Sequence, residues 1–140
     1  MEEWRDVAGY EGLYQASSLG RVRSLDHQRR GKGNSIAYAK GKIRAQRKDK
    51  DGYMRVNLSK DGVVRTEKVH TLVCAAFHEN PENKPTVNHI NCNRSDNRAD
   101  NLEWATVQEN TMHGYIYGKV SESQKKATEA ARLKRIKGVV

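Results

Sequence analysis

The stretch VNHINCNRSDNRADNLEWATVQEN, residues 87–110, decides how this 140-residue chain folds. Apolar and polar side chains alternate over residues 87–90, which is the pattern of a β-strand. Residues 91–100 are mostly small and polar and predict a loop, and residues 101–105 again have the pattern of a strand. The sequence therefore predicts two strands joined by a polar loop.

A helix is expected directly after this pair of strands. Thr106 followed by Glu109 has the form of a capping box, in which each side chain accepts a hydrogen bond from the other residue's backbone N–H. Asn110 then falls in the first turn of the helix. A strand, a loop, a strand and a helix in this order would bring His89, Asn101 and Asn110 together.

The residues before this stretch predict a hairpin and a short helix. Apolar and polar side chains alternate within residues 52–69, and Asp61-Gly62 is a strong turn pair for a hairpin. A helix is expected to begin near Val69, because apolar residues then recur at helical spacing. The apolar positions are Val69, Leu72, Val73, Ala76 and Phe77.

Charge is distributed unevenly along the chain. Lys and Arg number 26 against 17 Asp and Glu, for a formal net charge of +9. Residues 20–50 carry a net charge of +9 and residues 119–140 one of +5, whereas residues 70–118 carry −3. Phosphates attract basic surfaces and release counterions on binding. The charge distribution is therefore interpreted as that of a chain whose two basic ends bind a nucleic acid.

The N-terminal part predicts short strands and a basic loop. Over residues 1–26 short apolar stretches alternate with glycines, which indicates strands joined by tight turns. Arg21 and Arg23 share one strand face, which either faces solvent or, as we favour, phosphates. Residues 27–51 hold little that could form a core, so an extended basic loop ordered on DNA is expected. The candidate DNA contacts are Arg21, Arg23, Lys40, Lys42, Arg44 and Arg55.

The two cysteines do not predict a metal centre. Cys74 and Cys92 form no CxxC pair, so a structural zinc site is not expected. No secretory signal accompanies them, and Cys74 lies in an apolar run, which favours a reduced core thiol over a disulfide. No segment has the length of a membrane span, and the expected compartment is the cytoplasm.

Two blocks of this sequence resemble those of one family, in the family's order. One block resembles the HNH module of phage and intron homing endonucleases, and the other resembles the modular DNA-binding motif that precedes it. The resemblance covers residues 4–25 and about 52–114. The matching stretches are GYEGLY (9–14) and LGRVRSL (19–25) for the motif, and KVHTLVCAAF (68–77), VNHI (87–90) and NLEW (101–104) for the module.

The resemblance implies an α+β fold and a DNA-cleaving activity. A small N-terminal antiparallel β-sheet region would precede a ββα-metal (HNH) module and a basic C-terminal helix. The expected boundaries are residues 1–51, 52–118 and 119–140. The implied enzyme is a metal-dependent DNA endonuclease of the homing type that nicks or cuts both strands. Its partner would be double-stranded DNA, a monomer is favoured over a dimer, and a phage protein in a bacterial host is expected.

The family's chemistry implies a role for each matching residue. His89 would be the general base, and the side-chain carbonyl of Asn101 would orient its imidazole. An unperturbed histidine titrates near ~6.5, so a neutral imidazole is available at neutral pH. Asn110 and Asn88 would bind a divalent ion, Mg²⁺ first and Mn²⁺ as the alternative. The ion would contact the scissile phosphate and stabilise the leaving oxygen.

Two positions depart from the family's pattern. Some members carry Asp where this chain has Asn88, a neutral ligand that lacks anionic attraction for a cation. From the sequence alone, Asn88→Asp is expected to keep or raise activity and to lower the metal concentration required. The second departure is Asn91-Cys92, where Asp-Gly is expected.

Other histidines and other functions remain as alternatives at this stage. His70 is expected to have a structural or DNA-contact role, and His113 a supporting role beside Asn110. A DNA-binding regulator with a weakened catalytic site is the second hypothesis, and Asn88 is its best support. An RNA-binding protein is the third, resting on charge alone, because few aromatic residues are present for stacking on bases.

Overall fold

The computed structural model describes residues 1–117, apart from the side chains of Arg29 and Arg30. The architecture is α+β, as expected: the strands form small antiparallel sheets around two helices. In chain order the elements are β1 (Trp4–Asp6), β2 (Tyr14–Ser17), β3 (Val22–Ser24), β4 (His27–Arg30), β5 (Ile36–Ala39), β6 (Arg47–Lys48), β7 (Met54–Lys60), β8 (Val63–Lys68), α1 (Val69–Phe77), β9 (Thr86–His89), a 3₁₀ turn (Ala99–Asn101), β10 (Leu102–Ala105) and α2 (Val107–Tyr117).

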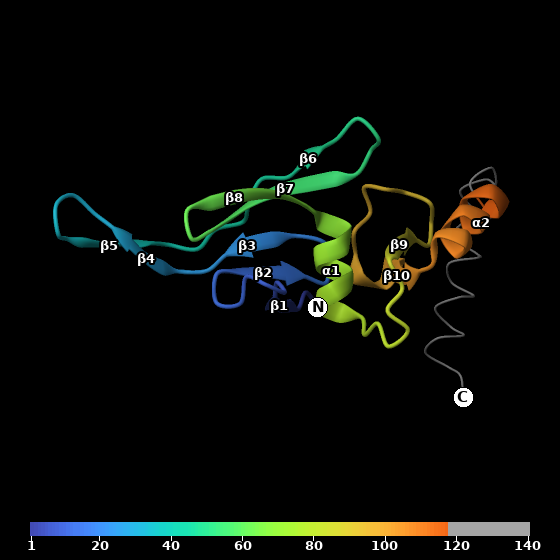
Figure 1. Cartoon of the computed structure of the whole chain (residues 1–140), viewed down its shortest axis with the longest axis horizontal. Helices are drawn as coiled ribbons and strands as arrows, with labels where there is room; N and C mark the ends of the chain where they lie inside the picture. Colours follow the sequence, from blue (N-terminus) through green and yellow to red (C-terminus); the bar gives the residue numbers. More distant parts are fainter. Residues whose placement is uncertain (118–140) are drawn as a thin grey trace.

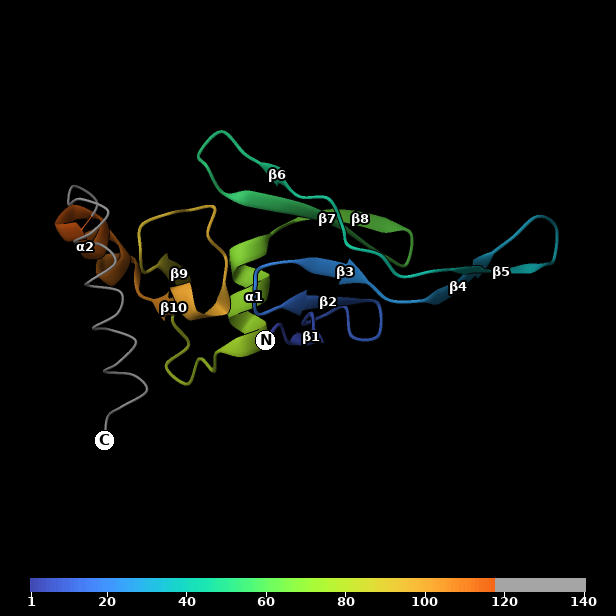
Figure 2. The same ribbon diagram turned by 180° about the vertical axis from the view of Figure 1, so that it is seen from behind.

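The molecule is elongated, with α1 near its middle. The β4–β5 hairpin extends from one end and α2 lies at the other, as the two opposite views agree (Figures 1 and 2). Within residues 1–117, no helix is both long and apolar enough to cross a membrane.

The N-terminal residues form an antiparallel sheet in the order β1-β2-β3. Val22 on β3 is fully buried, whereas Arg21 and Arg23 lie on the other face, as strand alternation predicts. The segment of residues 42–44 runs beside β3, because Ser24 N–H donates to Lys42 O at 2.9 Å and Arg44 N–H to Val22 O at 2.8 Å.

The expectation of a loop without regular structure over residues 27–51 is wrong. Strands β4 and β5 pair as an antiparallel hairpin, and β6 pairs with β7. The hairpin buries almost nothing: Ile36 is 65% exposed and Tyr38 is 76% exposed. The two strands therefore pair through their backbones although they pack against no apolar core. A buried apolar face is the feature by which we expected to recognise a strand in the sequence.

The hairpin expected within residues 52–69 is confirmed as β7 and β8. Asp61 and Gly62 form its turn with φ values of 53° and 78°, the left-handed conformation that a two-residue hairpin turn requires. The chain passes from β8 directly into α1 at Val69, where the helix was expected to begin.

Helix α1 joins the N-terminal sheets to the C-terminal unit. It contacts β1, β2, β7 and β8 on one side and β9 and β10 on another. The apolar positions expected on this helix do lie in or against the core. The core is one continuous cluster, whose fully or nearly fully buried aliphatic side chains include Val7, Val22, Val56, Leu58, Val69, Val73 and Leu102.

The C-terminal unit is the predicted strand, loop, strand and helix. Strands β9 and β10 pair antiparallel, with His89 opposite Leu102 and Asn88 opposite Glu103. The capping box is formed as predicted: Thr106 N–H donates to Glu109 Oε1 at 2.8 Å, and Glu109 N–H donates to Thr106 Oγ1 at 3.0 Å. The basic helix expected over residues 119–140 lies outside the described residues.

Both cysteines are free thiols, as expected. Cys74 is fully buried in the core, and burial raises the pKa of its thiol to about 12. A thiol with so high a pKa carries no nucleophilic thiolate at neutral pH.

Candidate active site

His89 ends β9 with its imidazole held by a loop residue. The side chain is only 6% exposed, and its Nε2 lies 2.8 Å from Asn97 Oδ1. An amide oxygen can only accept, so Nε2 carries the proton. The lone pair of the imidazole is then on Nδ1, and Nδ1 is the atom that can take a proton from water.

The expectation that Asn101 orients this imidazole is not what the structure shows. Asn101 is fully buried and its amide is used within the loop: Oδ1 accepts from Asn91 N–H at 3.0 Å, and Nδ2 donates to Asn91 Oδ1 at 3.0 Å and to Asp96 O at 2.8 Å. Asn101 therefore closes the loop that carries Asn97, and its effect on His89 is indirect.

The loop is also supported by the N-terminal sheet. Ala99 N–H donates to Ser18 O at 2.8 Å, across the turn between β2 and β3. Gly20 in that turn has φ +89°, and a Cβ built on it would lie 2.9 Å from Asn97 O. Only glycine permits this close approach, so the turn between β2 and β3 supports the residue that holds the imidazole.

Two aromatic neighbours surround His89. The ring of His70, on α1, lies 5.2 Å from the His89 ring in an edge-on arrangement, and the ring of Tyr53 lies 6.1 Å away. His70 is 7% exposed, and among the described residues its Nδ1 has no hydrogen-bond partner. His70 thus packs against His89 from the core side, and the structural or DNA-contact role expected for it stays a prediction.

Both imidazoles are neutral near pH 7. Burial lowers the pKa of His89 below its ordinary 6.5, and the hydrogen bond that His89 donates to Asn97 and the charge of Asp96 oppose this shift. Burial, together with the nearby His89, lowers the pKa of His70 to about 4. A neutral His89 can accept a proton at physiological pH, as a general base must.

Asn88 and Asn110 lie in the same pocket as His89, and each is anchored through its amide nitrogen. Asn88 Nδ2 donates to Glu103 Oε1 at 2.8 Å, and Asn110 Nδ2 donates to Val87 O at 3.0 Å. Among the described residues, no hydrogen bond engages the Oδ1 atom of either side chain. The pocket has a volume of about 360 Å³ and is lined by Tyr53, Val87, Asn88, His89, Cys92, Arg94, Asn110, Thr111, His113 and Gly114.

These donors fit a hard divalent cation, which prefers oxygen ligands. Within residues 1–117, no group of three or more His, Cys, Asp or Glu is placed to hold a metal ion. The oxygen donors that this pocket offers are therefore amide oxygens, and the assignment of Asn88 and Asn110 as metal ligands stays a prediction. Mg²⁺ commonly completes such a site with water and substrate phosphate oxygens.

His113 supports the pocket wall. It is 6% exposed, and its Nε2 lies 2.8 Å from Ile90 O, so Nε2 donates its proton to that carbonyl. Its ring packs on Tyr117 with centroids 4.7 Å apart. The Nε2 atom is thereby unavailable to a metal, and the supporting role expected from the sequence stays a prediction.

The candidate DNA contacts fall into two kinds. Lys40 and Lys42 are exposed at the base of the β4–β5 hairpin, and Arg44 is partly buried beside β3. Arg21 and Arg23 have protein partners: Arg21 pairs with Glu2, and Arg23 Nη2 donates to Gln15 Oε1 at 2.7 Å. Both guanidinium groups also lie over Trp4, at 5.5 Å and 4.1 Å from its centroid.

Arg55 is likewise held by the protein, because its Nε pairs with Asp49 Oδ2 at 2.8 Å. Another basic side chain, Arg94, belongs to the pocket and was missed from the sequence. Its Nη1 donates to Asp51 O at 2.8 Å and its guanidinium lies 4.9 Å from the Tyr53 centroid. Its position in a polar loop gives no periodic signal from which this contact could be foreseen.

Family models and known proteins match most of this chain. Two family models match, the NUMOD4 motif over residues 2–59 and HNH endonuclease over residues 67–112. The chain is 34% identical over 138 residues to DNA endonuclease I-HmuI of Bacillus phage SP01, which covers 99% of this chain and 71% of that protein. It is 38% identical over 117 residues to the uncharacterized HNH endonuclease L247 of Acanthamoeba polyphaga mimivirus, covering 80% of this chain and 26% of that protein.

A solved structure gives the same result for the fold. A solved structure of the HNH homing endonuclease I-HmuI, described as showing DNA binding and cleavage, matches this chain with a TM-score of 0.66 and 32% sequence identity. The match covers 97% of this chain and 68% of that one. The family resemblance found in the sequence is therefore confirmed at both of its blocks.

Proposed function

Because this chain belongs to the HNH homing endonuclease family of DNA endonucleases, we propose that it hydrolyses double-stranded DNA with His89 as general base and Mg²⁺ as metal ion. The observation that carries the proposal is the pocket shared by His89, Asn88 and Asn110. Since one relative is a protein of a Bacillus phage, we propose that it acts in the cytoplasm of a bacterial host. We further propose that it acts as a monomer, as expected from the sequence.

The proposed first step is removal of a proton from water by His89 Nδ1. Asn97 holds Nε2–H at 2.8 Å, which fixes the ring orientation and stabilises the positive charge that the ring acquires. His70 and Tyr53 pack beside the ring and keep water from most of its surface. The resulting hydroxide attacks the phosphorus atom, and the bond to the leaving oxygen breaks.

The proposed metal ligands are the Oδ1 atoms of Asn88 and Asn110. Bound there, Mg²⁺ would stabilise the negative charge that develops on the scissile phosphate and leaving oxygen. The hydrogen bonds from the two amide nitrogens to Glu103 and Val87 fix which atom of each side chain is presented to the pocket. The protein thereby prepares two oxygen ligands before DNA arrives.

The test is cleavage of plasmid DNA by the full chain with Mg²⁺, with Mn²⁺ and with EDTA. We expect supercoiled DNA to become nicked or linear with either ion and to stay intact in EDTA. Binding without cleavage in every ion would instead favour the DNA-binding regulator, the alternative that the neutral Asn88 supports.

We propose that residues 1–51 supply much of the DNA affinity and residues 52–118 the chemistry. Lys40 and Lys42 are exposed, whereas Arg21 and Arg23 already have protein partners. Each phosphate contact contributes about −0.9 to the slope of log K against log salt concentration. We therefore expect Lys40→Ala/Lys42→Ala to make that slope shallower by up to about 1.8.

A salt titration of DNA binding in Ca²⁺ measures this slope. Arg21→Ala/Arg23→Ala is the matched variant, because it removes the same charge from side chains that the protein already engages. We expect it to change the slope less. Equal slopes for the wild type and the lysine variant would show that Lys40 and Lys42 do not contact phosphate.

A further inference from the structure

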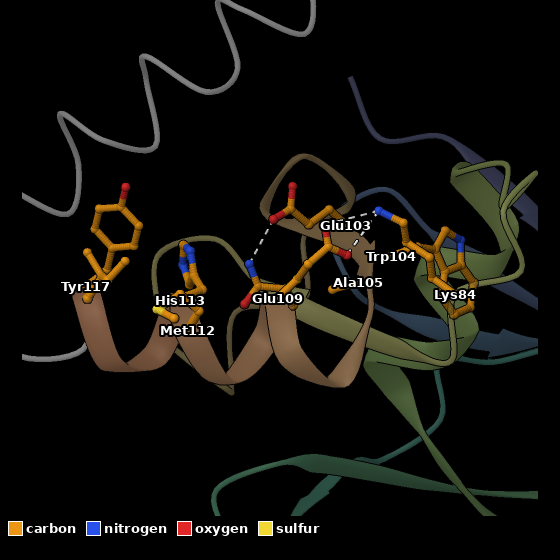
Figure 3. Close-up of a pocket in the computed structure, with 10 residues that line it drawn as sticks. Lys84, Glu103, Trp104, Ala105, Glu109, Met112, His113 and Tyr117 are labelled. Atoms are coloured by element: carbon orange, nitrogen blue, oxygen red, sulfur yellow. Dashed lines mark hydrogen bonds and ion pairs between the residues drawn. The ribbon is translucent and has the colours of Figure 1, made fainter.

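Asn88 lies between two pockets, and the second of them is lined by two carboxylates, those of Glu103 and Glu109. Besides lining the pocket of His89, Asn88 lines a pocket of about 460 Å³ on the side of β10 and α2. Glu103 lies opposite Asn88 in the β9–β10 register and accepts a hydrogen bond from Asn88 Nδ2 at 2.8 Å. Figure 3 shows Glu103 in this second pocket together with Glu109 and Lys84.

We propose that Glu103 is a positioning residue that supplies, through the amide of Asn88, the negative charge that this ligand lacks. The proposal rests on the proposed function, in which Asn88 Oδ1 binds the metal ion. A carboxylate that accepts an amide N–H makes a charge-assisted hydrogen bond and shifts electron density toward the amide oxygen. Glu103 also fixes the amide so that its oxygen, and not its nitrogen, is available to the pocket of His89.

Asn88 and Glu103 therefore act as one unit that contains one carboxylate. This revises the expectation for Asn88→Asp drawn from the sequence. An aspartate at this position would lose the N–H that Glu103 accepts, and it would place a second carboxylate directly opposite the first. A negative charge can therefore be placed at residue 88 only in a variant in which Glu103 is replaced by a neutral residue.

Glu109 provides a matched control in the same pocket. Its Oε1 lies 3.0 Å from Lys84 Nζ, so a lysine compensates its charge (Figure 3). It also caps α2 through Thr106, a role that glutamine can fill. Glu109→Gln removes one carboxylate from this pocket without touching Asn88.

The experiment measures Mn²⁺ binding directly, by electron paramagnetic resonance of the free ion. It uses the full chain on uncut DNA, in a His89→Ala background in which cleavage is expected to be slow. Glu103→Gln keeps an oxygen acceptor for Asn88 and removes the carboxylate charge. We expect it to raise the Kd for Mn²⁺ about 10-fold, as removal of a partner behind a metal ligand does elsewhere.

Two further variants complete the cycle. Asn88→Asp/Glu103→Gln restores one negative charge and is expected to return the Kd to the value of the parent protein, whereas Asn88→Asp alone is expected to bind Mn²⁺ less tightly than the double variant. Glu109→Gln is expected to leave the Kd unchanged. Circular dichroism checks that each variant is folded.

The outcomes separate the two proposals. If the parent protein binds Mn²⁺ and Glu103→Gln binds it equally well, the role of Glu103 is wrong while the metal site stands. An equal loss in Glu109→Gln would also overturn it, because the effect would then be one of general charge. If the parent protein binds no Mn²⁺, the metal role proposed for Asn88 fails, and that of Glu103 fails with it.

Discussion

His89→Ala is expected to lower the single-turnover rate of DNA cleavage by about 10²–10⁴-fold, the usual contribution of a general base. The affinity for DNA should change little, because His89 is only 6% exposed and its imidazole is neutral at pH 7. The rate is measured on a labelled duplex in Mg²⁺ at saturating protein, and the affinity in Ca²⁺.

A second substitution separates chemistry from packing. Alanine leaves a cavity beside His70 and removes the proton that Asn97 accepts, so part of its effect could come from local collapse. His89→Gln keeps a side-chain N–H for Asn97 and provides no base at neutral pH. We expect His89→Gln to cleave as slowly as His89→Ala, and a rate near that of the wild type would rule out His89 as the base.

The parts of the fold that could be predicted are those with a local pattern. The hairpin of β7 and β8 follows from alternation and from the Asp61-Gly62 turn, and the start of α2 follows from Thr106 and Glu109. Each of these signals lies within a few residues of the structure it specifies. A buried face or a reciprocal pair of hydrogen bonds then stabilises the element.

The β4–β5 hairpin could not be predicted in this way. Its side chains are mostly exposed, and Ile36 and Tyr38 point away from any core. Strand patterns in a sequence arise mainly because one face of a sheet is buried. Where no face is buried, the pairing of β4 with β5 leaves no alternation to detect.

The candidate site was predicted in part for a similar reason. His89, Asn88 and Asn110 lie on regular elements, so their convergence followed from the order of strand, loop, strand and helix. The contacts of Asn97 with His89 and of Glu103 with Asn88 follow no periodic pattern in the sequence. The contact of Asn97 further depends on the turn at Gly20, far away in the sequence.

Replacing Asn97 should mainly affect the cleavage rate, whereas replacing Asn101 should mainly affect the stability of the fold. Asn97→Ala removes the acceptor of His89 Nε2–H and leaves the ring free to turn. Because small errors in the position of a reacting group can cost up to 10²-fold, we expect the cleavage rate to fall about 10–10²-fold. Asn97→Asp keeps an oxygen acceptor and should retain most of the rate.

Asn101→Ala should instead destabilise the fold, since a fully buried amide with three hydrogen bonds is lost. At about 1 kcal/mol for each bond, the free energy of unfolding should fall by about 3 kcal/mol, more than for Asn97→Ala. Denaturant unfolding measures this difference, and cleavage is compared at a temperature at which both variants are folded. Asn97 acts on the imidazole directly, whereas Asn101 acts through the loop, so the folded Asn101→Ala protein should cleave faster than Asn97→Ala. If the folded Asn101→Ala protein instead cleaved more slowly than Asn97→Ala, Asn101 would be the residue that orients His89.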